Sequence, residues 1–121
     1  MHEEDFVIEE LIEFEIEGKK FKYKPVTAED ELNWAEEYIE IKDGVPTQNL
    51  TKITKCKLKN LMEVPYDIET INKIIGINKE WKELSHEERW ELIGKLKPKV
   101  FDKIISTINQ LDSTNPELKK N

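Results

Sequence analysis

The sequence is poor in the residues on which many kinds of enzymatic and structural chemistry depend. Its 121 residues include four glycines, two histidines and one cysteine, Cys56. A single cysteine cannot close an intrachain disulfide, which favours a reducing compartment. One cysteine with His2 and His86 forms no metal-binding motif, and four glycines contain no phosphate-binding loop. The sequence therefore assigns no catalytic, cofactor-binding or metal-binding residue, and it predicts a protein that is not an enzyme.

Long apolar runs are also missing. Hydrophobic and charged residues each make up 37% of the chain, and the apolar runs are too short for a signal region or a membrane-spanning helix. We therefore predict a cytoplasmic protein without membrane contact. Its length fits a single domain over residues 1–121, and the polar ends, residues 1–5 and 113–121, are predicted to be disordered.

Basic side chains are scarce in the first third of the chain. Residues 1–40 carry 14 acidic and 4 basic side chains, whereas residues 41–121 carry 12 acidic and 15 basic ones, within a net charge of −7. The acidic part disfavours nucleic-acid binding. It can meet the basic part within one chain or across a head-to-tail interface, so we predict a homo-oligomer that weakens with salt. A basic stripe of Lys52, Lys55 and Lys59 is expected to face solvent or a subunit.

What the sequence does contain begins with a β-hairpin. Apolar and charged residues alternate strictly from Ile12 to Tyr23, the period of a half-buried strand pair. We predict a two-residue Gly18-Lys19 loop, because glycine tolerates positive φ. This loop would pair Ile16 with Phe21 and Phe14 with Tyr23. On the wet face it would set Glu17, Glu15 and Glu13 opposite Lys20, Lys22 and Lys24.

Helical patterns follow the hairpin. Thr27 is a candidate N-cap for a helix from Ala28 to about Lys42, with one core stripe of Ala28, Leu32, Ala35 and Ile39 and a second of Trp34, Tyr38 and Ile41. Residues 43–49 have loop composition. Further helices are expected over Leu50–Glu63 and over Ile68–Ile75, the latter capped by Asp67 and closed by Gly76, although an extended Thr70–Ile77 is an alternative. Another helix is expected from a capping box at Ser85 to about Leu96. The last helix is expected to start at Pro98 and to carry a core stripe of Phe101, Ile104, Ile105, Ile108 and Leu111. The predicted fold class is α+β, a β-hairpin packed on a small bundle of four or five α-helices.

Large aromatic residues are the best candidates for partner contacts. A two-stranded hairpin is marginally stable alone, so its aromatic face must pack on helices of the chain or on another subunit. Tryptophans are common both in cores and at interface hot spots. The candidate partner-binding residues are therefore Phe14, Phe21, Tyr23, Trp34, Trp81 and Trp90.

The order of these parts resembles a known family. The hairpin ends in Phe21-Lys22-Tyr23-Lys24-Pro25-Val26, the next helix opens with Thr27-Ala28-Glu29-Asp30-Glu31, and the later helices contain Trp81-Lys82-Glu83-Leu84-Ser85 and Lys95-Leu96-Lys97-Pro98-Lys99-Val100-Phe101. This layout, over about residues 12–112, resembles the tail assembly chaperones of long-tailed phages. It is also similar to the baseplate hub assembly proteins of T4-type phages.

The resemblance implies a function but transfers no residue. It implies a non-enzymatic protein that binds the tape measure protein or other tail components during virion assembly in the bacterial or archaeal host cell, often as an oligomer. Two alternatives stay open. The protein could be a structural tail or baseplate adaptor retained in the virion, or a small acidic cytoplasmic regulator or inhibitor.

Overall fold

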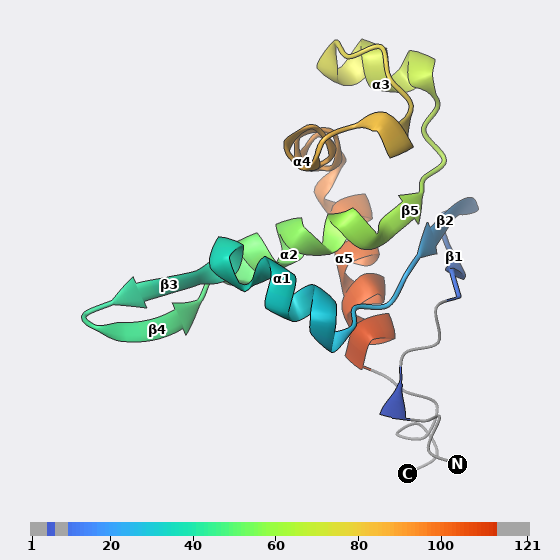
Figure 1. The fold of residues 1–121 in the computed structure, drawn as a ribbon. Helices are drawn as coiled ribbons and strands as arrows, with labels where there is room; N and C mark the ends of the chain where they lie inside the picture. Colours follow the sequence, from blue (N-terminus) through green and yellow to red (C-terminus); the bar gives the residue numbers. More distant parts are fainter. Residues whose placement is uncertain (1–4, 7–9, 114–121) are drawn as a thin grey trace.

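The computed structural model describes residues 5–6 and 10–113 and has the predicted α+β architecture (Figure 1). Strands β1, β2 and β5 form one antiparallel sheet, and β3 and β4 form a separate hairpin. The predicted disorder of residues 1–5 and 113–121 falls almost wholly outside the described residues, although Ser113 ends a helix. The elements are β1 (Ile12–Ile16), β2 (Lys19–Tyr23), α1 (Ala28–Tyr38), β3 (Ile39–Lys42), β4 (Val45–Gln48), α2 (Leu50–Lys57), η2 (Leu58–Asn60), β5 (Leu61–Glu63), α3 (Ile68–Ile75), η3 (Trp81–Glu83), α4 (His86–Gly94) and α5 (Pro98–Ser113).

The β1–β2 hairpin forms where the sequence predicts it, but its predicted register is wrong. The turn residues are Glu17 and Gly18, with φ of 52° and 79°, rather than Gly18 and Lys19. Positive φ at both central positions is the type I′ geometry that matches strand twist. Phe14 therefore pairs with Phe21, and Glu15 with Lys20. The slip is two residues, so every side chain keeps its predicted face.

The sheet has a third strand that the sequence analysis assigned to a helix. The helix predicted over Leu50–Glu63 ends at Lys57, and η2 leads into β5, which pairs antiparallel with β2. The β2 edge has unpaired backbone groups that need partners, and Asn60 accepts a 2.9 Å bond from the Lys24 amide. Leu58 and Leu61 are fully buried there, which stabilises the change from helix to strand.

The main core lies between this sheet and the C-terminal helices. Phe14 and Phe21 stack with ring centroids 5.3 Å apart, and α5 contributes Ile104 and Ile108 beside them. The predicted α5 stripe is confirmed, since its remaining members are partly buried against the same cluster. The buried members are Ile16, Phe21, Tyr23, Leu58, Leu61, Ile71, Trp81, Leu84, Leu92, Ile93, Ile104 and Ile108.

Helix α1 ends earlier than predicted. Residues 39–42 form β3, and the segment 43–49, predicted as a loop, contains a turn and β4. The turn residues Asp43 and Gly44 have φ of 53° and 78°, again a type I′ turn. Ile39 and Ile41 alternate with charged residues, as expected for a strand. The same two residues also fit the helical stripes predicted for this segment, so the sequence pattern did not distinguish the strand from a longer helix. The β3–β4 hairpin extends away from the rest of the molecule (Figure 1), and we refer to residues 39–48 as the arm.

The buried face of α1 carries two members of the second predicted stripe, whereas its third member, Ile41, lies in β3 and is 74% exposed. Trp34 and Tyr38 are 8% and 7% exposed, whereas Leu32, assigned to the core stripe, is 77% exposed. Trp34 and Tyr38 pack with Cys56 of α2 in a small second cluster. The aromatic stripe is the buried one because these two rings remove more apolar area from water than Ala28, Leu32 and Ala35 could.

The predicted caps of α3 and α4 and the predicted start of α5 are confirmed. Asp67 caps α3 through the Thr70 amide, and Gly76 closes it at φ 70°, so the extended alternative is wrong. Ser85 and Glu88 form the reciprocal capping box of α4. Helix α4 ends at Gly94, two residues before the predicted end, and Pro98 is the first residue of α5.

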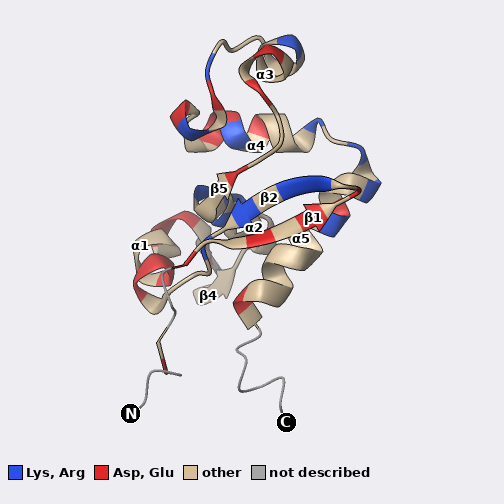
Figure 2. Ribbon diagram, turned by 90° about the vertical axis from the view of Figure 1, so that its right-hand side faces the viewer, with Lys and Arg blue, Asp and Glu red and all other residues tan. Residues whose placement is uncertain are grey.

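The acidic and basic parts of the chain meet within one molecule. In Figure 2, acidic residues recur along α1, and lysines mark β2. The basic stripe pairs with acids throughout: Lys52 with Glu40 at 3.4 Å, Lys59 with Glu37 at 2.6 Å, and Lys55 with Glu87 at 2.6 Å. The stripe is therefore engaged within the chain. Self-association through opposite charges stays a prediction.

Candidate functional site

Most of the aromatic residues predicted to bind a partner lie in the core. Phe21 and Tyr23 are fully buried, and Trp34 and Trp81 are 8% and 5% exposed. The Trp81 indole donates a 2.6 Å hydrogen bond to the Leu61 carbonyl, which gives that ring a structural role. Phe14 and Trp90 are partly buried against the main core. Together these six rings stabilise the fold and do not form one contact surface in the single chain.

The arm presents several apolar side chains to solvent. Ile41 is 74% exposed, Val45 58% and Ile39 42%. Ile41 pairs with Pro46 across the hairpin, and β3 and β4 pair with no further strand among the described residues. Each strand therefore has one open edge in addition to exposed apolar faces. Leu50, the first residue of α2 after the arm, is 75% exposed as well.

Polar contacts hold the root of the arm. Asn49 is the central residue: its amide donates to the Tyr38 carbonyl at 2.8 Å, and its side chain donates to Glu40 at 2.8 Å. The side-chain oxygen of Asn49 also caps α2 by accepting from the Lys52 amide. The Asn49 bond and the charge of Lys52 lower the pKa of Glu40 below its usual value. The arm thus leaves the body from a fixed base.

A pocket of about 170 Å³ lies beside that base. Its lining combines the two rings of the α1 cluster with polar groups from α2, β4 and α5, and these residues are Val26, Glu31, Trp34, Tyr38, Gln48, Ile53, Lys57 and Asp112. The volume is below the range of about 300–1,000 Å³ common for small-molecule sites. The pocket is therefore small for a drug-sized ligand.

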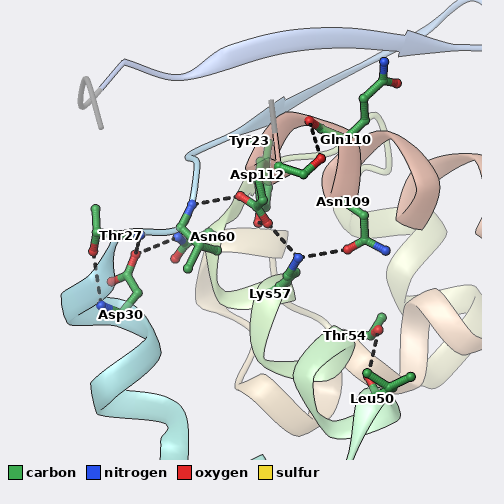
Figure 3. Close-up of polar contacts among 12 residues, drawn as sticks. Tyr23, Thr27, Asp30, Leu50, Thr54, Lys57, Asn60, Asn109, Gln110 and Asp112 are labelled. Atoms are coloured by element: carbon green, nitrogen blue, oxygen red, sulfur yellow. Dashed lines mark hydrogen bonds and ion pairs between the residues drawn. The ribbon is translucent and has the colours of Figure 1, made fainter. Parts of the chain in front are cut away.

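Asp112 of α5 is a structural clamp at one side of this pocket. Its carboxylate accepts from the Tyr23 hydroxyl at 2.8 Å and from the Val26 amide at 2.9 Å, and it pairs with Lys57 at 2.9 Å (Figure 3). Lys57 also donates to Asn109 at 2.9 Å. Burial, followed by the Asp112 charge, raises the pKa of Tyr23, so the phenol stays protonated and remains a donor. This network joins β2, α2 and α5.

A separate polar cluster is formed by Glu37, Cys56 and His86, which are far apart in the sequence. Glu37 lies in the last turn of α1, Cys56 lies in α2, and His86 is the first residue of α4. Their potential ligand atoms all lie within 4.8 Å of one another. The Cys56 thiol donates to Glu37 Oε2 at 3.0 Å, and the same oxygen accepts from Lys59 Nζ at 2.6 Å.

The environment sets the protonation of this cluster. Burial, reinforced by the bond to Glu37, raises the pKa of Cys56 to about 12, so the group is a thiol at neutral pH and a poor nucleophile. The bonds from Cys56 and Lys59 lower the pKa of Glu37. Burial, together with the charge of Lys59, lowers the pKa of His86 and keeps its ring neutral.

Sequence reasoning missed both the arm and this cluster. The Asp43-Gly44 pair was the available signal for the arm, since Asp-Gly between alternating residues favours a two-residue hairpin. The cluster has no comparable local signal, because its members lie 19 and 30 residues apart and meet only through the packing of three helices.

Comparison of the chain with protein-family models, curated proteins and solved structures finds no match. No helix within residues 5–6 and 10–113 has the length and apolar character needed to cross a membrane.

Proposed function

We propose that this protein is a non-enzymatic phage tail assembly chaperone that acts in the host cytoplasm. Its arm would bind the tape measure protein or another tail component before the virion is complete. The observation that carries the proposal is the exposure of Ile41 and Val45 on an arm that extends from the molecule. The layout that resembles tail assembly chaperones supplies the class of partner.

The arm suits a helical client. Apolar side chains exposed at 74% and 58% release ordered water when a partner covers them, which favours association. A long coiled-coil client presents apolar stripes before it finds its own partners. Such a stripe can cover the face of the arm that carries Ile39, Ile41 and Pro46, whereas Val45, opposite Lys42, lies on the other face. The held base at Asn49 reduces the ordering cost of binding.

Binding to a purified tape measure segment from the same phage tests the proposal. We expect the double substitution Ile41→Asp, Val45→Asp to weaken binding at least about tenfold, which corresponds to about 1.4 kcal/mol. Ile74→Asp on α3 is the control, since Ile74 is also an exposed apolar residue, at 46%, and α3 lies away from the arm (Figure 1). The control should bind as tightly as the original chain.

Three results would overturn the proposal. The first is equal binding by the arm variant and the original chain. The second is retention of the protein in purified mature virions, which would favour a structural adaptor. The third is a homo-oligomer that the arm substitutions dissociate, measured by sedimentation, while binding to the tape measure segment is unchanged.

A further inference from the structure

We propose that Glu37, Cys56 and His86 form a Zn²⁺ site. The three side chains come from α1, α2 and α4 and place their potential ligand atoms within 4.8 Å of one another. This proposal is independent of the function proposed for the arm.

The donor set fits zinc better than the hard cations. Zinc is bound in proteins by thiolate, imidazole and carboxylate at about 2.0–2.3 Å, whereas Ca²⁺ and Mg²⁺ take oxygen ligands. Ligands at those lengths in a tetrahedron lie roughly 3.3–3.7 Å apart. The Cys56 sulfur and Glu37 Oε2 are 3.0 Å apart, and no two of the potential ligand atoms are more than 4.8 Å apart, so side-chain shifts on the order of 1 Å would reach this spacing. A water molecule would fill the fourth position.

A second observation points to a ligand at this place. The Nδ1 atom of His86 is buried and has no hydrogen-bond partner among the described residues. A buried nitrogen without a partner costs free energy, and a metal ion bound at Nδ1 would remove that cost. Cys56 is 1% exposed, whereas the Glu37 side chain is 46% exposed, so an ion can enter from the Glu37 side.

Zn²⁺ binding would release one proton and break one ion pair. The Cys56 thiol, now hydrogen-bonded to Glu37, would lose its proton to solvent as the sulfur–zinc bond forms. One proton would therefore be released for each ion bound. Lys59, now 2.6 Å from Glu37, would move away as the divalent ion takes over its charge. The ion would join the helix that precedes the arm to the helix that follows it.

The test uses the full reduced chain with Zn²⁺ in calorimetry and Co²⁺ in absorption spectroscopy. We expect one ion per chain and a thiolate-to-cobalt charge-transfer band. Cys56→Ser should abolish the band and weaken Zn²⁺ binding at least about tenfold, and His86→Gln should weaken binding by a similar factor. Lys59→Gln should tighten binding, because it removes the competing cation.

Controls separate this site from adventitious binding. His2→Gln removes the other histidine of the chain and should leave Zn²⁺ binding unchanged. Zn²⁺ should raise the unfolding temperature of the original chain, which needs no variant to fold. Absence of the cobalt band, or Zn²⁺ binding that persists in Cys56→Ser and disappears in His2→Gln, would overturn the proposal.

Discussion

The two hairpins of this protein share their turn and differ in their surroundings. Glu17-Gly18 and Asp43-Gly44 both adopt positive φ at two successive residues, and both connect antiparallel strands. Yet Phe21 of the first hairpin is fully buried, whereas Ile41 of the second is 74% exposed. Local sequence is therefore sufficient to form a hairpin. Whether its apolar face is covered depends on elements far away in the chain, here β5 and α5.

The difference assigns the hairpins different roles. The first is the foundation of the main core, where the aromatic pair Phe14–Phe21 and two isoleucines of α5 exclude water. The second has no such cover, so its folding contributes little buried area to the domain. The uncovered apolar side chains of the arm are the basis of the partner contact proposed above.

The largest expected effect comes from truncating one apolar side chain in each hairpin, which compares the buried hairpin with the exposed one. Phe21→Ala should lower the free energy of unfolding by about 3–5 kcal/mol, because it removes a buried ring and leaves a cavity. Ile41→Ala should lower it by less than about 1 kcal/mol, since that side chain is already in water. Urea denaturation of both variants measures the two values. Similar losses would show that the arm is part of the cooperative core.

A second test uses the two turn glycines. An added Cβ meets no heavy atom within 4 Å at Gly18 or Gly44, so Ala at either position costs only the strain of positive φ, about 1–2 kcal/mol. Gly18→Ala should reduce global stability by that amount. Gly44→Ala should instead speed amide hydrogen exchange in the arm and change global stability by less than half as much. Equal global losses would contradict the separation of the arm from the core.

The smallest expected effect tests the pairing register of the β1–β2 hairpin. Glu15 lies opposite Lys20 on the wet face of the first hairpin, and such pairs contribute about 0.2–1 kcal/mol. A double-mutant cycle on Glu15 and Lys20 should give a favourable coupling in this range, reduced by added salt. The same cycle on Glu15 and Lys22 should give a weaker one. A stronger coupling in the second cycle would restore the register expected from a Gly18-Lys19 turn.

Local signals predicted those parts of the fold that local chemistry controls. The caps of α3 and α4 and the start of α5 follow from Asp67, Ser85 and Pro98, whose side chains act within one turn. The end of α2 could not be located in this way, because β5 pairs there with the distant strand β2, and helical periodicity carries no information about such a partner. Helix α1 ends at Tyr38 because residues 39–42 pair locally with β4 across the Asp43-Gly44 turn, and the helical spacing of Ile39 and Ile41 obscured that local signal.

The candidate sites were predictable to different degrees. The aromatic side chains were recognised as important, but a sequence cannot distinguish Phe21 in a core from a ring at an interface, since both require the same residue type. The cluster around Cys56 could not be predicted at all. Its three members become neighbours only after α1, α2 and α4 have packed.

The contact between Tyr23 and Asp112 has a consequence for how the protein is made. The two residues are 89 positions apart in the sequence, and a ribosome adds about 5–20 residues per second. Roughly 5–20 s therefore pass between the synthesis of the hairpin and that of its last bond. During this interval α5 cannot yet cover the aromatic face, so the nascent chain itself needs protection from aggregation. Completion of the core is a late event in translation, and a chain that stops before Asp112 lacks the contact that closes it.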